Sequence, residues 1–479
     1  MMPPKPFKKR KPDIDFTLRR VFKKTTFRSV QRQVIEAALE GHDVYLQAAT
    51  GLGKSLCFQL PAVQVEYGIT IVVSPLLSIM SNQVDALLEA GINAATLNST
   101  VGYEDKLKIF RDLECGHPKI RLLYVTPELC ATQNFRKKLE IVYRQRELNR
   151  IVIDEAHCIS EWGHDFRPAF KLLSMFKTEY PLVPITAVTA TATDRVREDI
   201  VTILRLPPPP TLKMYLLSTA RSSLHYEVRF KNDEANILED FLSWLRSVHQ
   251  RRQERDLPEG ERSDAVSGII YCQRRQSCEE LAAALRDNGI GAKCYHAGLT
   301  NDEKEEVARS WLVDKPGYDV IVATTAFGMG IDKPNVRFVV HWQVSKSFEG
   351  YYQEAGRAGR DGKAARCILY YSREDRDRTQ YLVNLEASKK RSGTTLGETL
   401  GKVQSFASLI SYCESTDICR HQAICDYFSD PEKPVCEWAC DYCKDKDALK
   451  RAKMLGLAEE EWVSTQREVG AYTVRYEIE

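Results

Sequence analysis

The chain contains a short glycine-rich stretch suited to holding a phosphate. Residues 48–55 read AATGLGKS, and Gly51 and Gly53 allow the backbone to turn so that successive N–H groups converge on one oxyanion. In a loop of this type Lys54 lies between the β- and γ-phosphates of a nucleotide, and the Ser55 hydroxyl binds Mg²⁺. The expected nucleotide-binding residues here are Thr50, Gly51, Gly53, Lys54 and Ser55.

A second stretch, residues 151–157 (IVIDEAH), supplies carboxylates. Its first three residues are β-branched, which is typical of a buried strand, and Asp154 follows at the end of that strand. We expect Asp154 to join Ser55 in holding Mg²⁺, and Glu155 to orient or deprotonate the attacking water. Either stretch alone can be a solvated turn. The two together, each behind an apolar strand, predict ATP binding and hydrolysis.

Composition and charge limit the class of protein. At 479 residues the chain is long enough for two or three domains. Its formal net charge is only +2, so any nucleic-acid contact must come from local patches. It has no run of about 18 apolar residues and no apolar signal core, so we expect no membrane segment. The basic run Lys8–Lys11 has three interpretations: a nuclear-import signal, an arm that binds a nucleic-acid backbone, or a solvated tail. The first would place the protein in the nucleus.

Apolar runs alternate with helical patterns from residue 40 to about 215, which is typical of a parallel sheet with crossover helices. The expected strands are Val44–Leu46, Thr70–Val73, Leu122–Val125, Ile151–Ile153 and Ile185–Val188, and Pro207–Pro210 ends the succession. A second succession has expected strands at Gly268–Cys272, Lys293–His296, Asp319–Ala323, Arg337–His341 and Cys367–Tyr371. Arg246–Asp264 is highly charged and lacks an apolar period, so we expect a solvated loop there.

Only the first of the two sheet domains carries a phosphate loop, so we expect ATP between the domains and a contribution from the second. Its candidates lie in residues 351–360 (YYQEAGRAGR), where Arg357 and Arg360 are expected to share one helix face at i, i+3. Such a pair is either a solvated basic face or an arginine finger on the γ-phosphate, worth ~10³–10⁵ in rate. The half-built site upstream favours the finger.

Cysteine is unevenly distributed. Of 14 cysteines, six lie between Cys413 and Cys443, and the other eight are mostly single residues in apolar runs, as in the core of a reduced intracellular protein. Four thiolates with short spacings can bind tetrahedral Zn²⁺ at about 2.3 Å, and the expected ligands are Cys419, Cys436, Cys440 and Cys443. Cys425 and Cys413 are spare, so either could replace Cys419. The alternative is a set of unrelated core cysteines.

Two aromatic residues follow the carboxylates closely, in residues 159–168 (ISEWGHDFRP). Trp162 and Phe166 could be core side chains, but the residues around them are loop-formers rather than a periodic apolar face. Aromatic side chains on a loop can stack on unpaired bases, at ~1–3 kcal/mol per base. We therefore expect this loop to contact single-stranded nucleic acid.

Together these motifs resemble the second helicase superfamily and, within it, the RecQ family of DNA helicases, over residues 20 to about 443. The resemblance implies an α/β fold with two tandem RecA-like parallel-sheet domains followed by a small helical Cys₄ zinc-binding module. The implied segments are a basic tail (1–19), the ATP-binding domain (20–215), the second helicase domain (216–375), the zinc module (376–445) and a C-terminal tail (446–479). Only 36 residues follow Cys443, too few for the winged-helix domain of many members, so we expect a short eukaryotic-type member without it.

The resemblance also implies roles for single residues. Gln31, in FRSVQ, is the expected adenine-binding residue, because a carboxamide can pair with N7 and the N6 amino group of adenine. The implied catalytic residues are Lys54, Asp154, Glu155, Gln353, Arg357 and Arg360. The implied DNA contacts are Ser74 (in SPLLS), Thr126 (in YVTPE), Trp162, Phe166 and Arg167. Residues 189–193 (TATAT) and 323–332 (ATTAFGMGID) resemble further helicase motifs, the first of which couples hydrolysis to domain movement.

The function expected from all of this is an ATP-dependent DNA helicase that uses ATP, Mg²⁺ and Zn²⁺ and acts on single-stranded and forked DNA in repair and recombination. Its 3′→5′ polarity comes from the resemblance alone, and the sequence does not identify its protein partners. Two alternatives are an RNA helicase of the Asp-Glu-Ala-His type and a DNA-dependent ATPase that acts as an annealing factor or switch without processive unwinding.

Overall fold

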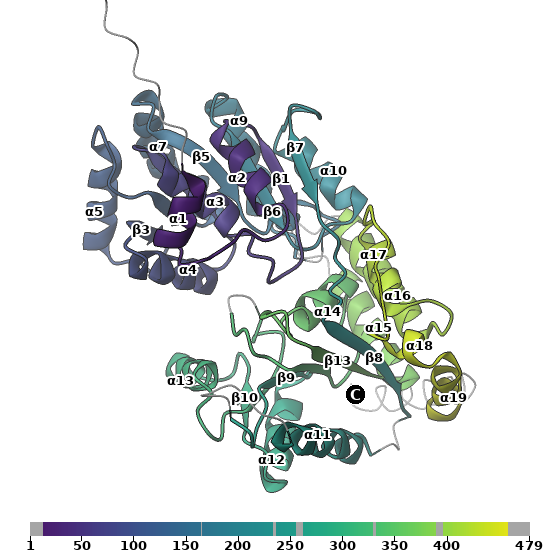
Figure 1. The fold of residues 1–479 in the computed structure, drawn as a ribbon. Helices are drawn as coiled ribbons and strands as arrows, with labels where there is room; N and C mark the ends of the chain where they lie inside the picture. Colours follow the sequence, from purple (N-terminus) through teal and green to yellow (C-terminus); the bar gives the residue numbers. More distant parts are fainter. Residues whose placement is uncertain are drawn as a thin grey trace, which may run out of the picture. The chain divides into compact units, whose positions relative to one another are not determined.

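The computed structural model describes residues 13–163, 165–232, 236–254, 262–328, 332–388 and 396–457. These residues form two compact units (Figure 1). The first comprises the described residues up to Leu217, apart from residues 49–51 and 161–163, which group with the second; the second comprises the described residues from Ser218 onward. Lys8–Lys11, Met329–Ile331 and the chain beyond Leu457, which carry part of the sequence predictions, lie outside the described residues.

The first unit is built on a parallel sheet. Among its described residues the sheet has seven strands in the order β3-β4-β2-β5-β6-β1-β7, and every neighbouring pair is parallel. The strands are β1 (Val44–Gln47), β2 (Ile69–Val73), β3 (Ala94–Leu97), β4 (Leu122–Val125), β5 (Leu148–Ile153), β6 (Ile185–Thr189) and β7 (Lys213–Leu216). β1, β2, β4, β5 and β6 are buried along their length except at Asn149, as expected for strands covered by helices on both faces.

Helices connect these strands. They are α1 (Ile14–Arg20), α2 (Gln31–Leu39), α3 (Leu56–Gln64), α4 (Leu77–Glu89), α5 (Tyr103–Glu114), α6 (Pro127–Cys130), α7 (Gln133–Arg144), η1 (Ala156–Ile159), α8 (Pro168–Lys171), η2 (Leu172–Ser174), α9 (Met175–Glu179) and α10 (Asp194–Ile203). The apolar residues of α2 pack on two sides: Val34 lies in a core cluster with strand residues, and Ile35 lies in a cluster with residues of α1 and α3. Both side chains are fully buried.

The second unit is also a parallel α/β sheet. In its described residues six strands lie in the order β10-β11-β9-β12-β13-β8, again with every pair parallel. The strands are β8 (Leu224–Phe230), β9 (Gly268–Tyr271), β10 (Ala292–Tyr295), β11 (Val320–Ala323), β12 (Phe338–His341) and β13 (Ala365–Tyr371). The helices are α11 (Ile237–Gln253), α12 (Arg275–Asp287), α13 (Asn301–Leu312), α14 (Phe348–Ala355), α15 (Arg373–Ser388), α16 (Leu396–Glu414), α17 (Arg420–Tyr427), α18 (Asp441–Lys444) and α19 (Lys446–Gly456).

The last helices lie along one edge of this second sheet. β8 is an edge strand, and α17, α18 and α19 all contact it (Figure 1). The chain before α18 forms a parallel bridge between Tyr226 of β8 and Cys440, in which the Tyr226 N–H donates to the Ala439 carbonyl at 3.1 Å. The Val228 N–H of the same edge donates to the Asp441 carboxylate at 2.9 Å. The cysteine-rich segment therefore satisfies backbone groups that the edge of a sheet otherwise leaves unpaired.

All ten strands expected from the apolar runs are present, with ends that differ by a few residues. Three further strands, β3, β7 and β8, are absent from the expectation. β7 is half-buried along its whole length, and β8 alternates buried and half-buried residues, so neither has a continuous apolar run. The prediction of two parallel-sheet domains is confirmed by both sheets.

The prediction of a solvated loop over Arg246–Asp264 is wrong for its first part. Helix α11 begins at Ile237, buries Phe241, Leu242 and Leu245, and continues to Gln253. Propagating a helix that packing has already nucleated adds one hydrogen bond per residue, and Arg and Gln are good helix formers. The charged half of α11 is therefore helical because it continues the apolar half, which packs against the sheet domain.

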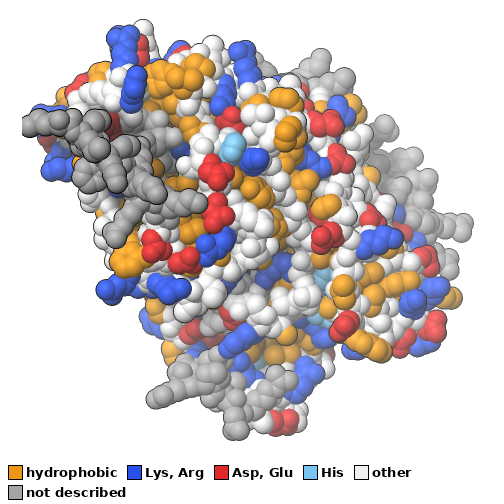
Figure 2. All heavy atoms as spheres, turned by 45° about the horizontal axis from the view of Figure 1, so that its top comes forward, with side chains coloured by type: hydrophobic (Ala, Val, Ile, Leu, Met, Phe, Trp, Pro, Cys, Tyr) orange, Lys and Arg blue, Asp and Glu red, His pale blue; other side chains and the backbone are white. Residues whose placement is uncertain are grey.

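The surface agrees with the small net charge. Figure 2 shows basic and acidic side chains interspersed with apolar ones on the face that it draws. No helix within the described part of the chain combines the length and the apolar character that crossing a bilayer demands.

Close packing between Gly268 of β9 and Phe338 of β12 predicts that a larger residue at position 268 destabilises the second unit. A Cβ on Gly268 would come within 2.0 Å of the Phe338 ring, so we expect Gly268→Ala to lower the free energy of unfolding by ~1–3 kcal/mol through overpacking. Chemical denaturation monitors the change. Gly116→Ala is the control, because a Cβ there meets nothing within 4 Å, and an equal loss in both variants would contradict the prediction.

Candidate nucleotide, DNA and zinc sites

The glycine-rich loop follows β1 and has the backbone that its sequence predicts. Gly51 and Gly53 have φ of +88° and +77°, which side chains rarely tolerate. Lys54 donates from Nζ to the Ala48 carbonyl at 2.9 Å, so its ammonium lies inside the turn of the loop. Ser55 immediately precedes α3, and its N–H and those beyond it are at the positive end of that helix. Thr50 is half-buried at the entrance to the loop.

Gln31 supports this loop directly. Its Nε2 donates to the carbonyls of Leu52 and Gly53 at 3.1 and 3.0 Å, and its Oε1 accepts from the Arg28 N–H at 2.8 Å. A Cβ on Gly53 would come within 2.5 Å of that amide nitrogen. Gln31 thus holds the phosphate loop, a role that the sequence prediction did not include. Its expected pairing with adenine stays a prediction.

The two carboxylates lie at the end of β5. Asp154 is 7% exposed, and its N–H donates to the Val73 carbonyl of the neighbouring strand at 2.9 Å. Burial raises the pKa of Asp154, the charge of Glu155 raises it further, and Lys54 opposes both effects. A buried carboxylate of this kind is stabilised by a cation, which fits the expected role in holding Mg²⁺. Glu155 adopts a left-handed φ of +50°, a strained backbone conformation for a residue with a side chain.

His157 links the carboxylates to β6. Its Nδ1 lies 3.0 Å from the Thr189 hydroxyl and 3.4 Å from a carboxylate oxygen of Glu155. The Thr189 hydroxyl in turn accepts from the Thr191 N–H at 3.2 Å. The ends of two adjacent strands are therefore joined by side chains as well as by the sheet. The sequence offered no signal for this role of His157 beyond its position after Asp-Glu.

The aromatic residues do lie on a loop, between η1 and α8. Trp162 and Phe166 are both half-buried, and the Lys171 ammonium lies 5.2 Å from the centre of the Phe166 ring. Arg167 closes the loop: its N–H donates to the Cys158 carbonyl at 2.9 Å, and its guanidinium donates to the Pro75 carbonyl at 2.7 Å. The loop is thus tied at its base to η1, which follows the carboxylates, and to the segment after β2.

Ser74 and Thr126 have structural contacts of their own. Ser74 is fully buried, and its N–H donates to the Val125 carbonyl at 3.0 Å. The Thr126 hydroxyl caps α6 by accepting from the Leu129 N–H at 3.4 Å. Both residues shape loops at the carboxyl edge of the sheet. Contacts of Ser74, Thr126, Trp162, Phe166 and Arg167 with DNA stay predictions.

The arginine pair of the second unit does not share a helix face, so that prediction is wrong. Helix α14 ends at Ala355, with Gly356 as its cap, and Arg357 and Arg360 lie in the turn that follows. Gly359 between them has a φ of +55°, which ends helical geometry. Gln353 lies within α14, one turn before the pair.

Both arginines are largely buried. Arg357 is 6% exposed and lies beside Tyr271; burial raises the pKa of that phenol, and the guanidinium opposes the effect. Arg360 donates to the Asp332 carboxylate at 2.8 Å. Burial lowers the pKa of Arg360, and the nearby charge of Arg357 lowers it further. Two buried cations this close favour the approach of an anion, which is what the arginine-finger hypothesis requires.

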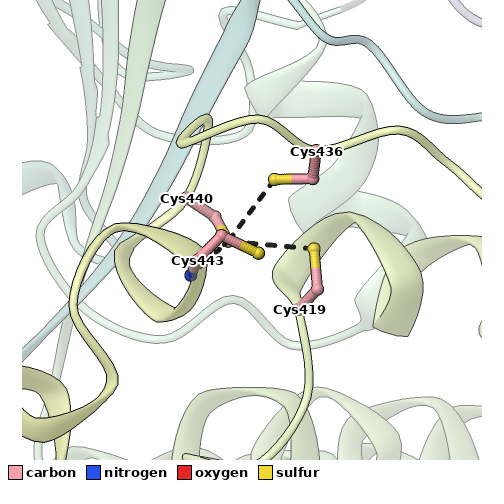
Figure 3. Close-up of side chains that lie close together, drawn as sticks. All are labelled: Cys419, Cys436, Cys440 and Cys443. Carbon is pink, nitrogen blue, oxygen red and sulfur yellow. Dashed lines mark hydrogen bonds between the residues drawn. The ribbon is translucent and has the colours of Figure 1, made fainter.

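The four cysteines predicted as zinc ligands lie together (Figure 3). Their Sγ atoms are all within 4.8 Å of one another; the Cys419–Cys440 separation is 3.8 Å and the Cys436–Cys440 separation is 3.7 Å. Tetrahedral zinc with Zn–S near 2.3 Å sets S···S distances of about 3.8 Å, so the cluster fits the ion. The Cys443 N–H donates to the Cys440 sulfur at 3.3 Å, which orients that ligand.

Electrostatics also favours a cation at this cluster. Burial and the neighbouring Cys440 raise the pKa of Cys436 to about 12, so the thiolate form needs a positive charge beside it. Neither spare cysteine belongs to the cluster. Cys413 is fully buried in the apolar core on α16, and the Sγ of Cys425 lies 3.7 Å from the Ser218 hydroxyl. Cys419 is therefore the fourth member.

Comparison with known proteins assigns the family. Residues 28–200 match the family model described as DEAD/DEAH box helicase, and residues 253–362 match the one described as Helicase conserved C-terminal domain. The chain is 41% identical over 442 residues to the ATP-dependent DNA helicase Q5 of Rattus norvegicus. Residues 373–444, which include all four clustered cysteines, match the model described as RecQ zinc-binding. The chain belongs to the RecQ family of helicases.

Other similarities agree with a RecQ helicase. The rat alignment covers 91% of this chain and 44% of the relative, and the ATP-dependent DNA helicase Q-like 2 of Arabidopsis thaliana is 39% identical over 91% of this chain and 58% of its own length. The chain thus spans about half the length of the curated relatives it matches. The structure of the DUF1998 helicase MrfA bound to DNA and AMPPNP aligns with a TM-score of 0.59 at 16% identity, covering 84% of this chain and 57% of that one. This likeness shows the fold.

The cysteine cluster generates a prediction about metal content. Purified protein should contain about one zinc ion per chain, and Cys419→Ser should lose most of it and lower the midpoint of thermal unfolding, because structural zinc sites fold with their metal. Elemental analysis measures the zinc. The control is Cys413→Ser, which leaves the cluster intact and should keep the ion; loss of zinc from Cys413→Ser but not from Cys419→Ser would contradict the ligand assignment.

Proposed function

We propose that this RecQ-family chain is an ATP- and Mg²⁺-dependent DNA helicase that moves 3′→5′ on single-stranded DNA and opens forked duplexes in the nucleus. The observation that carries the proposal is the link between the hydrolytic carboxylates and the aromatic loop that follows them in the chain, which is closed by the bond from the Arg167 N–H to the Cys158 carbonyl. The curated relatives are named as ATP-dependent DNA helicases, which supports DNA as the substrate.

In the hydrolysis step, the N–H groups around Gly51 and Gly53 would bind the β-phosphate and Lys54 would leave the Ala48 carbonyl for the γ-phosphate. Ser55 and Asp154 would hold Mg²⁺, which neutralises phosphate charge when bound. Glu155 would then take the proton of the attacking water. His157 keeps Glu155 near Thr189, so a change at the carboxylates is transmitted to the end of β6.

The second unit would contribute Arg357 and Arg360. Their guanidinium groups are mostly withdrawn from water, and charge–charge interactions are stronger where water is excluded. The negative charge of a γ-phosphate between the two guanidinium groups would offset the repulsion between them. Because these arginines stabilise the transition state rather than the bound nucleotide, their loss should affect turnover more than ATP affinity.

Strand movement would be coupled to hydrolysis through the aromatic loop. A base stacked on Trp162 or Phe166 pulls on a short segment whose two ends are fixed, one at η1 and one at Arg167. Each base-pair step opened costs ~1.4 kcal/mol of stacking on average, so a loosely coupled ATPase would unwind poorly. The zinc module argues against the RNA-helicase alternative, because residues 373–444 match the model described as RecQ zinc-binding.

A strand-displacement assay on a forked DNA duplex tests the proposal and separates it from its rivals. ATP-dependent displacement from DNA, with little stimulation of ATP hydrolysis by RNA, is the expected result. Stimulation by RNA alone would favour the RNA helicase. Hydrolysis stimulated by DNA without any displacement would favour an annealing factor or switch.

Substitutions at the hydrolytic centre should separate binding from turnover. Glu155→Gln should retain ATP binding and lose roughly 10²-fold or more in turnover, because it removes the group that takes the proton. Lys54→Ala should lose both, since it removes the charge beside the phosphates. Fluorescent nucleotide binding and steady-state ATP hydrolysis measure the two effects. Near-native turnover of Glu155→Gln would show that the base is another residue.

Substitution of Trp162 should uncouple DNA from hydrolysis. Trp162→Ala should keep basal ATP hydrolysis yet lose most of its stimulation by single-stranded DNA and all unwinding, because the stacking surface is gone. The rate is measured at saturating DNA, where affinity no longer limits it. The control is Tyr103→Ala, which removes an aromatic residue that is 73% exposed at the start of α5 and should behave as wild type. Full stimulation in Trp162→Ala would make this loop a packing element.

A further inference from the structure

A third arginine holds the backbone that carries the arginine pair. Arg221 lies just before β8, and its guanidinium donates to two main-chain carbonyls in the turn after α14. The Nη1–O distance to Gly356 is 2.8 Å, and the Nη2–O distance to Gly359 is 2.6 Å. These two glycines directly precede Arg357 and Arg360.

The bond to Gly356, the C-cap of α14, matches the chemistry of a helix end, and the bond to Gly359 holds the turn beyond it. The last carbonyls of a helix have no intrahelical partner and form the negative end of its dipole, where a cation is favourable. A guanidinium offers several N–H groups in a rigid planar fork, so one side chain can join two carbonyls three residues apart. Lysine has the charge but not the fork. Arg221 therefore sets the spacing between Gly356 and Gly359.

Arg221 is itself firmly placed. Its own carbonyl accepts from the Leu224 N–H at 2.9 Å at the start of β8. Two residues earlier, the Thr219 carbonyl accepts from the Tyr352 hydroxyl of α14 at 2.8 Å, and the Thr219 hydroxyl donates to Asp430 at 2.9 Å. The clamp is thus anchored to the helix that it caps and to the chain that follows α17.

The placement has an electrostatic cost that its hydrogen bonds must offset. The Arg221 charge is among those that lower the pKa of Arg360, after the larger effects of burial and of Arg357. A third cation next to two others is unfavourable in a site shielded from water. Since an uncharged donor would avoid that repulsion, the geometry of the fork is the property that this position requires.

We propose that Arg221 is a positioning residue for ATP hydrolysis: it fixes the turn at Gly356 and Gly359 so that Arg357 and Arg360 reach the γ-phosphate together. This inference rests on the proposed function, in which those two arginines complete the ATP site. Arg221 acts through them and takes no part in the chemistry.

The test is ATP hydrolysis by the full chain at saturating single-stranded DNA with varied ATP. Arg221→Lys should lower kcat about 10-fold and Arg221→Gln about 10²-fold, because a misplacement of about 1 Å in a phosphoryl-transfer site costs that much. The KM for ATP and the midpoint of thermal unfolding should change little. The matched control is Arg121→Lys: Arg121 also donates to several main-chain carbonyls, those of Ala62, Val65 and Glu66, but in the first unit at the far end of α3.

A double-mutant cycle distinguishes positioning from general stability. In an Arg357→Ala, Arg360→Ala background, Arg221→Lys should reduce kcat by less than about 2-fold further, because residues that act as a unit are non-additive. A full additional loss in that background, or an equal loss of kcat in Arg121→Lys, overturns the proposal. If the wild type hydrolyses ATP and both Arg221→Lys and Arg221→Gln keep its kcat, this proposal alone is overturned. If the wild type hydrolyses no ATP, the proposed function is overturned as well.

Discussion

Parallel pairing of strands is the constraint on which the rest of this structure depends. Because all neighbouring strands of each sheet run in one direction, their carboxyl ends meet at the same edge. The glycine-rich loop after β1, the carboxylates after β5 and the threonines after β6 are far apart in sequence and adjacent in space for this reason. In the second sheet, the same rule brings the segment after β11 to the end of β9, where the Tyr271 hydroxyl donates to the Phe327 carbonyl at 2.7 Å.

The loops at these edges are held by their own functional side chains. Gln31 bonds to the phosphate loop, His157 reaches Thr189, and Arg167 bonds to both η1 and the segment after β2. Loops built from short polar segments cannot rely on apolar packing for rigidity, so side-chain hydrogen bonds to backbone carbonyls replace it. A ligand that forms a hydrogen bond with one of these side chains in place of the loop would therefore also remove a bond that holds the loop.

The sequence predicted elements better than it predicted the contacts between them. Buried strands are visible because both faces are covered and their apolar runs are continuous, and the cysteines are visible because a tetrahedral ion restricts their spacing. The end of α14 was missed because the interval between Arg357 and Arg360 suits a helix, whereas the φ of Gly359 does not. The contacts of Gln31 and Arg221 join residues remote in sequence, and no local pattern encodes them.

The bridge between Tyr226 and Cys440 gives the cysteine cluster a second importance. β8 is the outermost strand of its sheet, and the main chain around Cys440 pairs with its open side. An open strand edge is a template for pairing with other chains. The segment that carries two of the clustered thiols, Cys440 and Cys443, therefore also covers the open side of β8, at the main-chain groups of Tyr226 and Val228.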